Sequence, residues 1–225
     1  THTSSAEPQP PPMTAPEVDH VVMGVADLDD ATVWLAEQGI TALPGGTHPH
    51  WGTANRIVPL GSAYLELVAV VDPSVAAASA FGSWVAAQAR GDAAWGWAVR
   101  PHDVAATAER LDLDVVPGSR VRPDGVTLSW QLAGVPDERS DRSLPFFIAW
   151  GDGVPLPGEA AVTHDAGTVR LRGLTVGGDE AVLHDWLGGE VDGVVVTSGR
   201  AGVLAVVLTT PSAEVTLRPP LADPR

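Results

Sequence analysis

The order strand, helix, three strands occurs three times along the chain, and this repetition constrains the fold more than any other feature. The three occurrences begin with the segments VDHVVMGV, AWGWAVR and TVRLRGLTVG. In each, an alternating apolar run is followed by an Asp suited to cap a short helix, namely Asp27, Asp103 or Asp179. A period of this kind indicates a fold assembled from copies of one small unit.

The repeats also predict where the units begin and end. We expect a flexible Pro-rich tail over 1–17, a first βαβββ unit over 18–71, a connecting helix over 72–92, a second unit over 93–151, a linker over 152–166 and a third βαβββ-like unit over 167–219. The predicted fold class is α+β, with repeated βαβββ units whose curled mixed sheets enclose a pocket and carry helices on the outer face.

Composition narrows the partners and the chemistry. The formal net charge is -15, which repels phosphate backbones and argues against nucleic acids and anionic membranes. The chain has no Cys, so any metal ligands must be His and carboxylates. No run reaches the length of a transmembrane helix and residues 1–17 lack the features of a signal peptide, so we expect a cytoplasmic location.

Two polar residues stand on otherwise apolar strands, His20 in VDHVVMGV and Glu66 in AYLELVAVV. Strand alternation places His20 with Val22, and Glu66 with Tyr64, on the faces that suit a cavity rather than the helix layer. Burying such groups is costly unless they are paired. Two pairings stay open, one through a divalent metal and one in which the two residues hydrogen-bond each other or a buried water.

The loop THPHWGTAN lies between these two strands and is suited to line the same pocket. Trp51 would stack on a ligand there, and Thr53 and Asn55 would hydrogen-bond it. The alternative is that the Trp packs on the core. Because neighbouring residues of a strand face opposite sides, Asn55 is assigned to the pocket and Arg56 to the outside.

The sequence resembles the glyoxalase-like branch of the vicinal oxygen chelate superfamily. The resemblance rests on the segments DHVVMGVADLDDA, HPHWGTANRIVPLG, YLELVAVVD and LPFFIAW, and it covers residues 18–150. It implies that two units pack together around a pocket, with a divalent metal held by residues on the first and fourth strand of each unit. His20 and Glu66 match these positions in the first unit. A third ligand would come from His48, from His50 or from the third, unpaired unit.

The second unit departs from the ligand pattern of the superfamily. Its first strand offers Trp97 or Val99, and its fourth strand offers Ala149 or neighbouring aromatic residues, where a metal enzyme would carry His, Gln or Glu. Trp residues of this unit usually belong to a core, and Trp97 is taken as the exception that contacts a ligand. The predicted ligand-binding residues are His50, Trp51, Thr53, Asn55, Tyr64, Trp97 and Phe147.

Three functions follow from these observations. The first is a protein that binds a small organic molecule in the pocket and whose metal site is incomplete. The second is a metal-dependent lyase or isomerase, or a ring-cleaving dioxygenase, in which His20 and Glu66 hold the metal and Glu66 also moves a proton. The third is a non-catalytic scaffold that forms a homodimer, because three units leave one without a partner. One divalent metal ion (Zn, Ni, Mn or Fe) and no cofactor at all are equal expectations.

Overall fold

A computed structural model describes residues 15–121, 125–137 and 140–222. The tail predicted for residues 1–17 therefore lies mostly outside the described residues, and Glu17 already belongs to the first strand. None of the described helices is long and apolar enough to cross a membrane.

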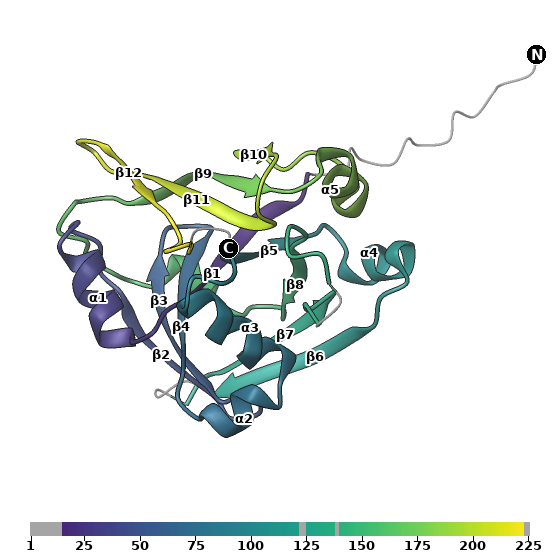
Figure 1. Ribbon diagram of the computed structural model, residues 1–225, viewed down its shortest axis with the longest axis horizontal. Helices are drawn as coiled ribbons and strands as arrows, with labels where there is room; N and C mark the ends of the chain where they lie inside the picture. The colour runs from purple at the N-terminus through teal and green to yellow at the C-terminus, as the bar shows by residue number, and fades with distance from the viewer. Residues whose placement is uncertain (1–14, 122–124, 138–139, 223–225) are drawn as a thin grey trace, which may run out of the picture.

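The first two units together form one eight-stranded sheet (Figure 1). Its strands are β1 (Glu17–Gly24), β2 (Leu43–His48), β3 (Thr53–Pro59), β4 (Tyr64–Val70), β5 (Gly96–Arg100), β6 (Val115–Val121), β7 (Thr127–Ala133) and β8 (Phe146–Trp150). The order across the sheet is β2-β3-β4-β1-β5-β8-β7-β6, so each unit contributes four strands and the two halves mirror each other. The antiparallel pair β1 and β5 forms the seam between them. The repeated units and the mixed sheet predicted from the sequence are confirmed.

Aspartates begin the helices of all three units, as the sequence predicts. Asp27 caps α1 (Leu28–Ala36), Asp103 caps α4 (Val104–Leu111) and Asp179 caps α5 (Glu180–Leu187), each by accepting hydrogen bonds from two backbone N–H groups. Such caps satisfy donors that a helix leaves unpaired and are typically worth about 1 kcal/mol.

The main core lies between the outer face of the large sheet and the layer that covers it. It contains Val21 and Met23 of β1 and Leu65 and Leu67 of β4, together with apolar residues of α1, α4 and α5. The helices of the units therefore cover the outer face, as predicted. The opposite face carries Val22 and Val68 and faces the cavity, which confirms the strand phases.

The connecting segment differs from the single helix predicted over 72–92. It forms α2 (Pro73–Ala77) and α3 (Ala80–Ala89), and α3 lies on the concave side of the large sheet rather than on its outer face (Figure 1). Phe81, Trp84 and Val85 of α3 pack there against the second core cluster. Gly96 allows this approach, because a Cβ at that position would overlap the Trp84 ring.

The third unit repeats the order of elements but not the pairing of strands. It consists of β9 (Arg170–Gly177), α5, β10 (Val194–Thr197), β11 (Gly202–Thr209) and β12 (Glu214–Leu217), joined to the second unit by a linker with a short 3₁₀ turn at Pro157–Glu159. Its sheet order is β10-β9-β11-β12, whereas the first unit has its first strand beside its fourth. This small sheet packs on the outer face of the large one and shares its core.

Candidate functional site

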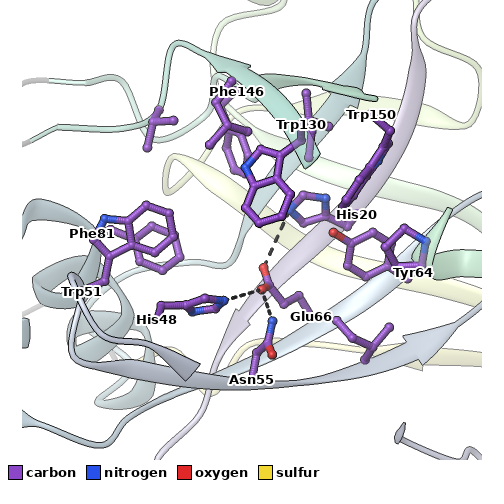
Figure 2. A pocket seen from close by; sticks show the side chains of 15 residues that line it. His20, His48, Trp51, Asn55, Tyr64, Glu66, Phe81, Trp130, Phe146 and Trp150 are labelled. Atoms are coloured by element: carbon purple, nitrogen blue, oxygen red, sulfur yellow. Dashed lines mark hydrogen bonds and ion pairs between the residues drawn. The ribbon is translucent and has the colours of Figure 1, made fainter. Parts of the chain in front are cut away.

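A small cavity of about 80 Å³ opens on the concave face of the large sheet (Figure 2). Both of the first two units contribute to its walls, and α3 and the linker contribute one side each. The side chains that line it are His20, His48, Trp51, Asn55, Ile57, Tyr64, Glu66, Phe81, Trp130, Leu132, Val135, Phe146, Ile148, Trp150 and Pro157. Most of these are apolar or aromatic, which is the usual character of a ligand pocket.

Glu66 is the acidic residue in this lining, and polar groups surround it. Asn55 Nδ2 donates a hydrogen bond to Glu66 Oε1 at 2.5 Å. Two imidazoles approach from other sides, with His20 Nε2 at 3.8 Å from Oε2 and His48 Nε2 at 4.0 Å from Oε1 (Figure 2). The Glu66 side chain is only 12% exposed. The pairing of His20 with Glu66 that the strand phases indicate is therefore present, at a separation longer than a hydrogen bond.

His20 is oriented by its own chain neighbour. His20 Nδ1 lies 2.6 Å from Asp19 Oδ1, although consecutive residues of a regular strand point to opposite faces. The register between β1 and β5 shifts at this point, because Val18 pairs with Val99 and His20 already pairs with Ala98. Asp19 is thus the extra residue of a β-bulge, which turns its carboxylate toward the imidazole.

Asp19 is completely buried and joins three partners. Besides His20, its carboxylate accepts hydrogen bonds from Arg100 Nη1 at 2.7 Å and from Trp150 Nε1 at 3.0 Å. Burial alone would raise the pKa of the Asp19 carboxyl, but the hydrogen bond with His20, the charge of Arg100 and the Trp150 N–H together outweigh it and lower that pKa below 3.8. The Asp19 carboxylate is therefore ionised and holds the proton of His20 on Nδ1.

Strands β2 and β3 position the other polar groups. His48 Nδ1 lies 3.0 Å from Thr53 Oγ1, which directs His48 Nε2 toward Glu66. Asn55 Oδ1 accepts a hydrogen bond from the Gly46 backbone N–H at 2.7 Å, and this fixes the amide so that its nitrogen faces the carboxylate. The segment around His48, read as loop in the sequence, is the end of strand β2, whose pairing with β3 is irregular between Pro44 and Thr47.

Aromatic rings form the remaining walls. Tyr64 stacks on His20 with ring centroids 4.6 Å apart, and Phe146 meets the same imidazole edge-on at 5.4 Å. Trp130 and Trp150, directly paired across β7 and β8, lie 5.7 Å apart. On the side of α3, the rings of Trp51 and Phe81 lie 4.5 Å apart. These rings come from both of the first two units, so the shape of the pocket depends on how the two units pack together.

Trp51, Asn55 and Tyr64 of the predicted ligand-binding set line the cavity, whereas Trp97 and Phe147 do not. Both of the latter are fully buried in the core of the outer face, where Trp97 Nε1 donates to the Ser143 carbonyl at 2.9 Å and Phe147 stacks on Trp186. Both side chains were expected to face the pocket, but they point to the opposite face of the sheet, and the side chains of adjacent strand residues face the pocket instead. Trp130, Phe146 and Trp150 take the aromatic positions instead.

Two residues of the β2–β3 region also differ from expectation. His50 is exposed and does not line the cavity, so the loop histidine that reaches Glu66 is His48. Thr53 is fully buried and supports His48 rather than facing the cavity. Arg56 faces outward, where it hydrogen-bonds the Thr32 hydroxyl and pairs with Asp29, as its strand phase predicts.

Besides the three aromatic residues, the sequence did not indicate Asp19 as part of this site. Its only signal was its place beside His20, one of several neighbouring His and Asp pairs in the chain. Regular alternation assigns it to the other face, and only the bulge brings it to the imidazole.

Strand register identifies the positions of the second unit that correspond to His20 and Glu66. In the first unit His20 lies opposite Tyr64 on parallel strands, and in the second Ala98 lies opposite Phe146 in the same way. Two residues further on, Glu66 corresponds to Ile148. The second wall therefore carries Ala98 and Ile148, rather than the Val99 and Ala149 considered from the sequence, and neither residue is able to ligate a metal.

The donor set does not fit a bound metal ion. Among the described residues, no group of three or more His, Asp or Glu side chains is placed to hold one. The equivalents of the two first-unit ligands are Ala98 and Ile148, and Glu66 Oε1 is already bonded to Asn55. A catalytic zinc site normally has three protein ligands.

Two βαβββ units that join their first strands at a seam and enclose a pocket on the concave face define the architecture of the vicinal oxygen chelate superfamily. The sequence pattern of the glyoxalase-like domain family matches residues 18–189, so the chain belongs to that family. The matched region includes every residue that lines the cavity.

Solved structures match this chain at low sequence identity. A hypothetical protein from Staphylococcus aureus is 16% identical with a TM-score of 0.61, over 90% of this chain and 85% of that chain. Methylmalonyl-CoA epimerase from Mycobacterium tuberculosis is 22% identical with a TM-score of 0.35, over 51% of this chain and 77% of that chain. No curated protein sequence matches the chain. The first likeness shows a shared fold, and the second is too distant to support an argument.

Proposed function

We propose that the protein binds a small organic molecule in the cavity between its first two units, with Glu66 as the polar anchor and the surrounding rings as the apolar contacts. The observation that carries this proposal is that the nearly buried Glu66 carboxylate faces a cavity, and no Arg is among the described residues that line it. Burying a charge is expensive, so a purely structural Glu66 would be expected to have a close cationic partner, as Asp19 has in Arg100.

A test of this proposal compares ligand binding before and after the cavity is filled. A mixed set of small organic molecules is screened for a rise in melting temperature, and the molecules that stabilise the protein are titrated for 1:1 binding. Leu132→Trp fills the cavity from β7, and Val116→Trp adds the same ring at an exposed position of β6. We expect the first variant to lose binding and the second to keep it. Binding that survives Leu132→Trp, or a screen without any ligand, would contradict the proposal.

The hydrogen bond between Asp19 and His20 favours a second candidate function, a lyase or isomerase that moves a proton next to a carbonyl group. A carboxylate that fixes the tautomer of an imidazole leaves Nε2 free of the proton and able to accept one from a substrate. His20 would then return that proton to the neighbouring atom of the substrate, and the Glu66 carboxylate, 3.8 Å from Nε2, would stabilise the imidazolium in between. This assignment uses His20 as base and acid without a metal.

The second candidate predicts exchange of substrate protons with solvent. Dihydroxyacetone and hydroxypyruvate are incubated in D₂O with the protein, and the loss of their carbon-bound proton signals is followed by NMR. His20→Asn should abolish the exchange, and Glu214→Gln, at an exposed site on β12, should leave it unchanged. Exchange that never exceeds the buffer rate would rule out this activity for these substrates.

The metal-dependent alternative, with His20 and Glu66 as ligands, is tested on the same protein. Its melting temperature is measured with and without Zn²⁺, Ni²⁺, Mn²⁺ and Fe²⁺, and purified protein is analysed for bound metal. We expect shifts below about 1 °C, because about 1 kcal/mol of binding energy moves the melting temperature of a domain this size by about 2–4 °C. Stoichiometric metal that disappears in His20→Asn would favour the metal enzyme instead.

A further inference from the structure

We propose that the molecule bound in this cavity carries a positive charge, and that the cavity holds its ammonium or protonated nitrogen head group between Glu66 and the aromatic rings. The inference rests on the proposed function, because it names the chemical class of the ligand for the same cavity. Charge, hydrogen-bonding geometry, ring placement and size each support it.

The charged groups of the lining favour a cation. Glu66 is the carboxylate among the described lining residues, and no Arg side chain is among them. Arg100 pairs with Asp19 and Glu17 and does not line the cavity. The chain as a whole carries a net charge of -15, so its field attracts cations and repels anions.

The second oxygen of Glu66 faces a gap that suits a positively charged group. Glu66 Oε1 accepts the hydrogen bond from Asn55 Nδ2, whereas His20 Nε2 lies 3.8 Å from Glu66 Oε2, which is longer than a hydrogen bond. A positively charged nitrogen that approaches Oε2 from the cavity would neutralise the Glu66 carboxylate, and an N–H group on that nitrogen would also donate a hydrogen bond to it.

The aromatic rings offer the second part of a cation site. Cations are attracted to the faces of Trp, Tyr and Phe rings within about 6 Å of their centroids. Glu66 is surrounded in Figure 2 by the rings of Trp51 and Phe81 on one side, Trp130 and Phe146 above, and Tyr64 beyond His20. A carboxylate among such rings combines charge neutralisation with contacts that also suit the alkyl groups of an ammonium ion.

The size of the cavity limits what enters it. A volume of about 80 Å³ compares with a share of about 30 Å³ for one water molecule in the liquid, so only a few heavy atoms fit. This volume suits the head group of an amine better than a complete drug-sized molecule. The remainder of a longer ligand would extend out of the cavity toward solvent.

Probes of equal shape and different charge test the inference. Choline, its neutral isostere 3,3-dimethylbutan-1-ol and the anion 3,3-dimethylbutanoate are titrated into the protein by calorimetry and by quenching of Trp fluorescence. We expect choline to bind on the order of tenfold more tightly than the alcohol, and the anion not to bind. Glu66→Gln should remove most of the difference between choline and the alcohol, and Glu214→Gln on β12 should preserve it.

The outcomes separate this inference from the proposed function. Equal or tighter binding of the alcohol, or binding of the anion, overturns the cationic ligand while the cavity remains a binding site. Absence of binding by all three probes also overturns it, and the wider screen with Leu132→Trp then decides the proposed function separately. The comparison of the three probes uses the unaltered protein, so it stands even if Glu66→Gln does not fold.

Discussion

The side chains of Asp19 and His20 are consecutive in the chain and yet meet at 2.6 Å, because a β-bulge at Asp19 turns both toward the same region. Through this contact the orientation of His20 depends on Arg100 and Trp150, which hold the other oxygen of Asp19. The seam between β1 and β5 therefore determines both the joining of the two units and the tautomer of the histidine in the cavity.

Replacing Asp19 by Asn should destabilise the protein in a pH-dependent way. The loss of a buried charge leaves Arg100 without its closest carboxylate, so we expect a decrease of about 3–5 kcal/mol in the free energy of unfolding at pH 7. The folded pKa of Asp19 lies below 3.8, so its stabilisation is present above that pH and is lost as the pH falls through the folded value. The difference between variant and wild type should therefore narrow below about pH 3.8.

Urea unfolding at several pH values between 7 and 2.5 measures this effect. Asp152→Asn, which removes a carboxylate from an exposed turn, is the matched control and should change stability by less than about 0.5 kcal/mol. A constant difference between Asp19→Asn and wild type over the whole pH range would show that the charge of Asp19 is not what stabilises the fold.

Restoring ligands to the second wall should create a metal site. Ala98→His combined with Ile148→Glu places a second His and Glu at the positions equivalent to His20 and Glu66. We expect Ni²⁺ or Zn²⁺ at 100 times the dissociation constant to stabilise this variant by about 2.7 kcal/mol. Thermal unfolding with and without metal measures the gain.

Val99→His combined with Ala149→Glu is the control for this experiment, because it carries the same groups one residue out of phase. Val99 lies on the same strand face as Trp97, and Ala149 on the same face as Phe147. Both positions therefore point away from the cavity. Equal stabilisation of both double variants by metal would contradict the equivalence of Ala98 and Ile148 to His20 and Glu66.

The close approach of α3 to β5 predicts a coupled pair of mutations. Gly96→Ala should cost about 1–3 kcal/mol, because the added methyl group overlaps the six-membered ring of Trp84. Trp84→Phe makes room, so the double variant should be more stable than the sum of the two single changes by about 0.5–3 kcal/mol. Chemical unfolding of the four proteins gives this coupling energy, and a value near zero would show that Gly96 is not needed for the position of α3.

Strand alternation predicted the face of four first-unit residues that line the cavity, although it also placed Thr53 there, which supports His48 instead. His20, Asn55, Tyr64 and Glu66 all lie on the face that the period of two assigns to them. The Asp caps were equally predictable, because capping depends only on neighbouring residues. These parts of the fold and the site are encoded locally.

The features that could not be predicted depend on residues far apart in the chain. The bulge at Asp19 exists only relative to β5, about eighty residues later in sequence. The same register decides that Ala98 rather than Trp97 lies beside His20. The different strand order of the third unit is likewise a matter of long-range pairing, since the order of its elements along the chain is that of the other two units.

The packing of the small sheet has a consequence for the unit of folding. Val203, Val206 and Leu208 of β11 and Leu217 of β12 belong to the same core as Val21 and Leu65, and Trp95 bridges to Val203 by backbone pairing. A chain cut at residue 166 would keep every side chain of the cavity but would uncover the outer side of β1 and β4. We therefore expect the shortened chain to aggregate, because the apolar face that the third unit covers would be exposed to water. The two units that form the cavity thus need the third unit in order to fold as a soluble protein.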